Sequence, residues 1–224
     1  MTHSICESTR HALEQHLPKS VVVKTGLPTN KKLFPAEEAQ IAGASTPRRH
    51  EYATGRSLAH RALIELGHPP RSIINHESLE PEWPQGIVGS ISHCKAVVCV
   101  ALSRSQNLNS IGIDVEMEGR LTSRSLKRIL TEREYANLQK LDNQEQLAKA
   151  TKIFSAKESI YKCTSSAWNA RLGFKDITID LNSSDDTFSV RPESSNSQAM
   201  GWGKFEGRVK SSLGFVVSSA IIQN

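Results

Sequence analysis

The segment from residue 46 to residue 67, TPRRHEYATGRSLAHRALIELG, carries the clearest structural signals in the chain. Thr46 suits the N-cap of a helix and Pro47 its first position, while Gly67 follows the last periodic apolar residue. Apolar residues between these limits recur at helical spacing. The later stretch GIVGSISHCKAVVCVALS is rich in small and β-branched residues and predicts one or two strands. This half of the chain must therefore pack a helix on strands.

The same combination returns after the polar linker SRSQNLNS. SIGIDVE predicts a strand, a Thr-x-x-Glu capping box predicts a helix over 131–141, and apolar spacing predicts a longer helix over 145–163. Four later segments alternate as antiparallel strands do: FKDITIDL, DTFSVRP, GKFEGRVK and LGFVVSSAII. We therefore predict two α/β halves, residues 1–107 and 108–224, each of ordinary domain size.

Composition narrows the class of protein. The chain has 224 residues, of which 38% are hydrophobic, and it contains no apolar run near the length that spans a bilayer. The N-terminal residues are polar where a signal peptide would be apolar, so we expect a cytoplasmic protein. The four cysteines form no CxxC pair, which predicts free thiols. The net charge of +5 suits a nucleic acid, an anionic membrane, or a phosphate-rich small molecule together with an acidic protein.

Three carboxylates are candidates for a metal site. Asp114 and Glu116 are one residue apart in GIDVE, so on a strand both leave the same face and repel each other unless a cation intervenes. Glu158, in FSAKESIYK, lies at the edge of a helical apolar stripe, where a charge needs a partner. Oxygen ligands in this number suit Mg²⁺ at a phosphoryl-transfer site. The alternatives are a solvated strand edge and an ordinary surface pair of Glu158 with Lys162; Lys157, taken alone, indicates a solvated charge.

Basic residues offer a second set of candidates. The 46–66 helix carries arginines that form either a solvated face or a grip on phosphates: Arg48, Arg49, Arg56 and Arg61. His93 in SISHC is typical of a core or turn histidine, but beside Ser92 it would also give a phosphate two polar contacts. Cys94 points away from His93 on a strand, which argues against a paired thiol nucleophile.

Four segments taken in order resemble one family. RRHEYATGRSLAHRALIELG, WPQGIVGSISHC, IGIDVE and FSAKESIYK are similar to the motifs of 4′-phosphopantetheinyl transferases of the surfactin and enterobactin type, over roughly residues 46 to 175. The wording FSAKES resembles the enterobactin-type branch, whose members serve siderophore synthetases. The resemblance implies an α+β fold of two similar α/β subdomains related by a pseudo-twofold axis, in a cytoplasmic and commonly monomeric enzyme.

The resemblance also implies a reaction. The phosphopantetheine arm of coenzyme A would move to a serine of an apo acyl, peptidyl or aryl carrier protein, releasing 3′,5′-ADP, with Mg²⁺ as cofactor. Residue roles follow by motif match: Asp114, Glu116 and Glu158 would bind the metal, Glu158, Lys162 and Glu116 would serve catalysis, and Arg48, Arg56, Ser92, His93 and Lys162 would contact coenzyme A. Arg49 stays open as an alternative to Arg48, because it aligns better with Arg56.

The chain departs from the family pattern at one position, and a second interpretation of its function remains open. Many relatives carry a Lys or Arg shortly before the P-x-W-P segment, where it reaches a coenzyme A phosphate, whereas this chain has none between Arg71 and Trp83. Either His76 substitutes for it or the contact is missing. The rival is a non-catalytic basic module that binds a nucleotide or nucleic acid. It lacks a Walker-type loop and zinc-finger spacing, and aromatic residues make up only 5% of the chain, so stacking platforms for bases are scarce. We therefore expect no nucleic-acid partner and no membrane span.

Overall fold

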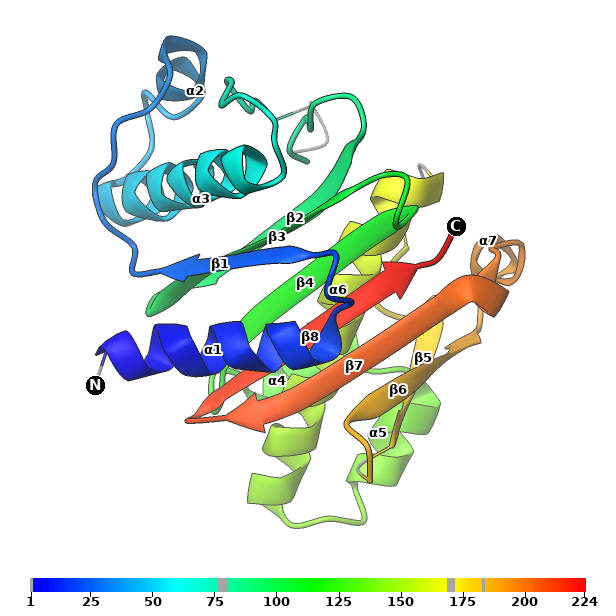
Figure 1. Cartoon of the computed structure of the whole chain (residues 1–224). Coiled ribbons are helices and arrows are strands. Elements are labelled where there is room, and N and C mark those ends of the chain that lie inside the picture. The colour runs from blue at the N-terminus through cyan, green and yellow to red at the C-terminus, as the bar shows by residue number, and fades with distance from the viewer. Residues whose placement is uncertain (1, 76–79, 169–171, 183) are drawn as a thin grey trace.

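A computed structural model describes residues 2–75, 80–168, 172–182 and 184–224. His76, the candidate substitute for the missing basic residue, lies outside these ranges. The N-terminal part contains three helices and three strands among the described residues (Figure 1): α1 Thr2–His16, β1 Val22–Gly26, α2 Pro35–Gln40, α3 Thr46–Glu65, β2 Ile87–Cys94 and β3 Val97–Arg104. The C-terminal part contains β4 Ser110–Met117, α4 Ser123–Ile129, α5 Glu132–Leu138, α6 Asn143–Trp168, β5 Ile177–Asn182, β6 Thr187–Pro192, α7 Ser195–Gln198, the 3₁₀ turn η1 Trp202–Lys204, β7 Phe205–Ser212 and β8 Phe215–Ile222.

The N-terminal strands form an antiparallel sheet in the order β1-β3-β2. Helix α3 covers one face through buried Leu58, Ala62 and Leu63, which pack on Val98 and Val100 of β3. The predicted helix and the predicted strand pair are both confirmed. The prediction of Thr46 as N-cap is wrong by one residue: Ser45 occupies the extended cap position and Thr46 is the first helical residue, with Pro47 beside it in the first turn.

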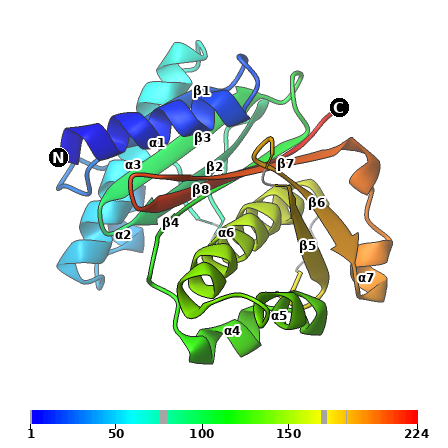
Figure 2. The same ribbon diagram turned by 90° about the horizontal axis from the view of Figure 1, so that it is seen from below.

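The C-terminal strands form a five-stranded antiparallel sheet in the order β4-β8-β7-β6-β5. All four strand-like segments near the C-terminus are strands, as predicted. The capping box is present, since Thr131 Oγ1 accepts from the Glu134 amide and the Glu134 carboxylate accepts from the Thr131 amide. Helix α6 is longer at both ends than predicted and packs along β4 and β8, on the face opposite α1 (Figure 2).

The two parts repeat one topology. In each, a first strand is followed by a long helix and later by a hairpin whose second strand pairs with the first, so that β1-β3-β2 corresponds to β4-β8-β7. The second part adds α4 and α5 before its long helix and the β5-β6 hairpin after it. The confirmed architecture is α+β with two sheets, and the relation of the halves by a pseudo-twofold axis stays a prediction, as does the boundary at 107. Helix α1 belongs to the first part by sequence, yet it packs on β7 and β8 as well as β1.

Strands β2 and β4 meet at the junction of the two sheets. They are linked through serine side chains: Ser90 Oγ accepts from the Ile113 amide at 3.1 Å, and Ser92 Oγ accepts from the Val115 amide at 3.2 Å. These hydroxyls satisfy donors on the edge of β4 that would otherwise be buried without partners. The junction therefore sets the SISHC segment beside the GIDVE segment. In the described part of the chain, no helix has both the length and the apolar character needed to cross a membrane.

Candidate active site

A buried carboxylate and a lysine form the centre of the site. Lys162 Nζ of α6 donates to Asp114 Oδ1 of β4 at 2.7 Å, to Ser92 Oγ of β2 at 3.1 Å and to the Ile113 carbonyl at 3.2 Å. Ser92 also donates to Asp114 Oδ1, at 2.9 Å. Asp114 Oδ2 is buried and has no partner among the described residues. One node thus joins both sheets and the long helix, and leaves one carboxylate oxygen free to bind a ligand.

Glu116 lies two residues further along β4, on the face that it shares with Asp114. Its carboxylate accepts from Arg120 Nη1 at 2.8 and 3.2 Å, and the residue is buried. Burial, together with the negative charge of Asp114, raises the pKa of Glu116 to about 7, against the opposing effect of Arg120. The predicted repulsion between the two carboxylates is therefore present, and Arg120, which sequence analysis did not single out, partly offsets it.

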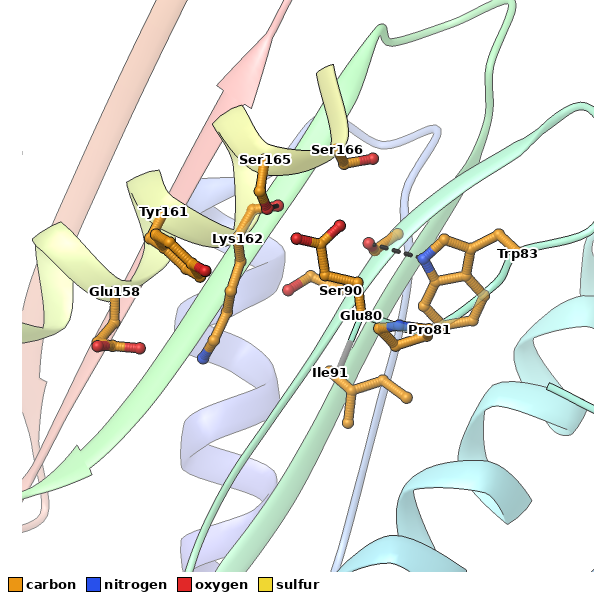
Figure 3. A pocket seen from close by; sticks show the side chains of 11 residues that line it. Glu80, Pro81, Trp83, Ser90, Ile91, Glu158, Tyr161, Lys162, Ser165 and Ser166 are labelled. Carbon is orange, nitrogen blue, oxygen red and sulfur yellow. Dashed lines mark hydrogen bonds between the residues drawn. The ribbon is translucent and has the colours of Figure 1, made fainter. Parts of the chain in front are cut away.

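Glu158 lies on α6, one turn before Lys162. Burial raises the pKa of its carboxyl group, and the charge of Asp114 acts in the same direction, while Lys162 and Arg120 oppose them. Glu158 and Tyr161 line two pockets at once: one of about 280 Å³ beside β2 (Figure 3) and one of about 250 Å³ with largely apolar walls at Leu172, Phe174 and Ile177. The carboxylate therefore borders both pockets, of which the first also holds the charged side chains of Glu80 and Lys162.

The three predicted metal ligands are not gathered around one point. Within the described ranges, no group of three His, Cys, Asp or Glu side chains is assembled as a metal site. The physical reason is that cationic side chains already contact two of them: Lys162 holds Asp114 and Arg120 holds Glu116. The donor chemistry nevertheless fits a hard divalent cation, because Asp114 Oδ2 is an orphaned buried oxygen and the pKa of both glutamates is raised by burial.

Arg48 and His93 lie together at the other side of the node. Arg48 Nη1 donates to His93 Nε2 at 2.6 Å, and Glu51 Oε2 lies 3.3 Å from His93 Nδ1 and 3.7 Å from Arg48 Nη1. Burial lowers the pKa of His93. The Arg49 guanidinium donates instead to the Glu38 carboxylate of α2 and to the Ile41 carbonyl that follows this helix. The structure therefore brings Arg48, rather than Arg49, to the predicted phosphate-binding histidine.

Arg56 is buried, with only 3% of its surface exposed. Its guanidinium lies over the Tyr52 ring, 4.3 Å from the centroid, and donates to Asn75 Oδ1 at 2.5 Å. Arg56 Nε is buried without a partner in the described part of the chain. This arginine is thus held in place by neighbours and retains one unused donor. Arg61 lines a separate cavity with Arg10 and Lys24, away from the node.

The interpretation of Lys157 as a solvated charge is wrong. Its side chain is 1% exposed, and its ammonium donates to the Glu134 carboxylate at 2.7 Å, the Ile129 carbonyl at 3.0 Å and the Phe174 carbonyl at 2.6 Å. The capping-box glutamate therefore has a second role as the counterion of a buried lysine. Cys94 is buried, and burial raises the pKa of its thiol, which disfavours the thiolate that a nucleophile requires.

The fold and the node define a mixed α/β protein whose two sheets meet at a cluster of acidic and basic side chains. Two family models match this chain: "4'-phosphopantetheinyl transferase N-terminal domain" over residues 36–103 and "4'-phosphopantetheinyl transferase superfamily" over residues 110–202. The chain is 33% identical over 198 residues to 4'-phosphopantetheinyl transferase Svp of Streptomyces mobaraensis, covering 85% of this chain and 78% of that protein. The chain belongs to the 4′-phosphopantetheinyl transferase family.

Two further relatives and one solved structure are also similar to this chain, and the two relatives agree with this assignment. Npt of Nocardia iowensis, also described as a 4'-phosphopantetheinyl transferase, is 33% identical over 206 residues, covering 86% of this chain and 90% of that protein. Enterobactin synthase component D of Escherichia coli K12 is 36% identical over 143 residues, covering 63% and 66%. A holo-(acyl-carrier-protein) synthase from Bacillus anthracis, solved with CoA (3',5'-ADP), aligns with a TM-score of 0.41 at 19% identity, over 53% of this chain and 98% of that one. The predicted family and its transfer activity are confirmed.

Proposed function

We propose that this chain transfers the phosphopantetheine arm of coenzyme A to a serine of acyl, peptidyl or aryl carrier domains, in siderophore or other non-ribosomal peptide or polyketide synthesis. One observation carries the proposal: Lys162, Asp114 and Ser92 join both sheets and the long helix at a single hydrogen-bonded node. A site at this junction can contact a long cofactor from both halves. As the resemblance to the family implies, we expect a monomer that acts in the cytoplasm.

Mg²⁺ would be held by Asp114, Glu116 and Glu158. When bound, it would supply positive charge beside the pyrophosphate of coenzyme A. The support is the free Asp114 Oδ2 and the raised pKa of both glutamates, since each marks a carboxylate that lacks full compensation. The ion pairs of Lys162 with Asp114 and of Arg120 with Glu116 would rearrange to admit the ion.

The basic residues would hold the cofactor by its phosphates. Arg48 and His93 already lie within hydrogen-bonding distance of one another, so a phosphate between them would meet two donors once His93 is protonated or suitably oriented. Ser92 would add a hydroxyl from the same strand. Arg56 has a buried, unused Nε donor, and its contacts with Tyr52 and Asn75 keep the guanidinium oriented. Lys162 would neutralise the departing 3′,5′-ADP.

The transfer step exchanges one oxygen–phosphorus bond for another. The carrier serine oxygen forms a bond to the phosphorus that bears the pantetheine arm, and the bond from that phosphorus to 3′,5′-ADP breaks. Glu158 takes the serine proton, either directly or through a water, because partial burial raises the pKa of its carboxyl group. Glu116, whose pKa is about 7, is the second candidate base. The apolar pocket at Leu172 and Phe174 suits the pantetheine arm.

Intact-mass spectrometry tests the proposed reaction. Apo carrier domains of siderophore, polyketide and fatty-acid type are incubated with the protein, coenzyme A and Mg²⁺. The expected result is a mass gain of one phosphopantetheine arm on at least one carrier, removed by chelation of Mg²⁺. No gain on any carrier, with the protein folded, would contradict the proposal. The rival binding module would then be favoured if an oligonucleotide raised the melting temperature more than coenzyme A with Mg²⁺ does.

A further inference from the structure

The pocket beside β2 contains a carboxylate with no role in the proposed chemistry. The pocket lies between α6 and the segment that leads into β2, and Lys162 and Glu158 stand at one end. Glu80, Pro81 and Trp83 line the opposite wall. Figure 3 shows the Glu80 carboxylate extending across the pocket toward Ser165 of α6. The acidic group therefore faces the cavity rather than bulk solvent alone.

Glu80 is followed directly by three residues whose backbone or side chain is anchored. Pro81 forms a bridge with Asn75, and the Glu82 amide donates to the Ile74 carbonyl at 2.8 Å. Trp83 Nε1 donates to the Gly89 carbonyl of β2 at 3.0 Å. In contrast, the Glu80 carboxylate accepts no hydrogen bond and forms no ion pair with any residue that the structure describes. An anchored backbone thus presents an unpaired acceptor to the pocket.

An unpaired carboxylate is unfavourable in a site for a polyanion unless the ligand brings a donor to it. Coenzyme A carries phosphates at one end of its nucleotide, suited to Lys162, and at the other end an adenine whose exocyclic amine is a hydrogen-bond donor. Trp83 and Ile91 supply an aromatic and an aliphatic surface to the same pocket, as a planar base requires. A cation, an apolar wall and an unpaired acceptor therefore all line one pocket.

We propose that Glu80 is a specificity-determining residue that accepts a hydrogen bond from the exocyclic amine of adenine in coenzyme A. The inference rests on the proposed function, because it assumes that coenzyme A binds with its pyrophosphate at Lys162. A carboxylate accepts from an amine but is repelled by a carbonyl oxygen. The site thereby distinguishes adenine from hypoxanthine, in which an oxygen replaces the amine.

Equilibrium binding tests the inference without the transfer reaction. Calorimetry gives the Kd of adenosine 3′,5′-bisphosphate and of inosine 3′,5′-bisphosphate for the wild type, for Glu80→Gln and for Glu82→Gln. Glu82 is the matched control, because it lies on the same segment but is exposed and does not line the pocket. The wild type is expected to prefer the adenosine compound by at least about tenfold, as for a hydrogen bond to a charged group. Glu80→Gln should reduce this preference by about tenfold, since an amide can also donate to the oxygen, whereas Glu82→Gln should leave it unchanged.

Three outcomes would overturn the inference. The first is equal binding of the two bisphosphates by the wild type. The second is an equal gain in affinity for both on Glu80→Gln, which would make Glu80 merely a repulsive group. The third is the same change in both variants. Failure of the proposed function would look different: no carrier would gain mass, whatever the nucleotide preference. The two hypotheses therefore fail separately.

Discussion

The two halves of the molecule share a topology but bring different side chains to the junction. Helix α3 lies over the β1-β3-β2 sheet and contributes Arg48 and Arg56, whereas α6 lies on the β4-β8-β7 strands and contributes Glu158 together with Lys162. The strands that meet at the junction differ likewise: β2 brings neutral and basic groups, and β4 brings two carboxylates. In the proposed function, the arginines of the first half bind phosphates and the carboxylates of the second half bind a cation.

The halves also differ in which element carries the glycine at the contact between the long helix and the sheet. In the first half the glycine is on the helix: a Cβ added at Gly55 would lie 3.2 Å from a methyl group of Ile91, a contact that small shifts relieve. In the second half the glycine is on the strand: a Cβ at Gly112 would lie 1.9 Å from the Ser159 carbonyl oxygen of α6. The close approach at Gly112 sets α6 against β4 and hence Lys162 against Asp114.

The largest effect is expected on the rate of carrier modification, when the charge of Glu158 is removed. Glu158→Gln should lower the rate of carrier modification by at least about a thousandfold, or about 4 kcal/mol, because a base and a metal ligand are lost together. The melting temperature should not fall, since the substitution removes a partly buried charge. Glu145→Gln, an exposed position on the same helix, is the control and should keep full activity. Near-normal turnover of Glu158→Gln would remove both roles from Glu158.

The next largest effect is expected on the free energy of unfolding, when each of the two glycines is replaced by alanine. Gly112→Ala should destabilise the protein by about 3 kcal/mol or more, because the new methyl group meets helix backbone that cannot rotate away. Gly55→Ala should change stability by less than about 1 kcal/mol, since the higher helix propensity of alanine offsets the tight contact. Urea unfolding of both variants provides the measurement. Equal destabilisation would show that the approach of α6 to β4 is not closer than that of α3 to its sheet.

The smallest effect concerns α1, which connects the halves. Both ring nitrogens of His16 are buried without partners in the described part of the chain. Burial, reinforced by Arg208 and Lys210, lowers the pKa of His16 to about 4, from 6.5 when unfolded. The unfolded chain therefore binds the proton first, so stability is full above pH 6.5 and falls as the pH drops toward 4. The loss amounts to at most about 3 kcal/mol.

Unfolding free energies measured at pH 7 and pH 4.5 test this effect. Part of the difference should disappear in His16→Leu, which removes the titrating group. His11→Leu, at an exposed position on the same helix, should retain the full difference. An unchanged pH dependence in His16→Leu would show that other groups cause the acid sensitivity.

The sequence predicted those parts of the structure that local periodicity controls. The 46–66 helix, the strand pair after it and the four C-terminal strands all follow from spacing and turn residues. Helix α1 was missed, because polar Thr9 and His16 lie on its buried face beside Ala12 and Leu13 and obscure the apolar pattern. Their burial depends on β1, β7 and β8, which are distant in sequence.

The site was predictable in residue type but not in pairing. Motif order indicated Asp114, Glu116, Glu158 and Lys162, yet spacing alone pairs Lys162 with Glu158, whereas the structure pairs it with Asp114 across the junction. The burial of Lys157 depends on Glu134 and on the Phe174 carbonyl, which reach it from separate segments. Such contacts arise from tertiary packing and leave no local signal.

We propose that the basic residues bind the phosphates of coenzyme A and that the carboxylates bind Mg²⁺. Calorimetry of coenzyme A binding with and without Mg²⁺ tests these separate roles most directly. In the wild type, Mg²⁺ should tighten binding by about tenfold. Glu158→Gln should retain the affinity measured without Mg²⁺ and lose the tightening, whereas Arg48→Ala should lose the affinity and retain the tightening. If both variants lost the Mg²⁺-free affinity, or both lost the tightening by Mg²⁺, the basic residues and the carboxylates would not have separate roles, and the proposal would be contradicted.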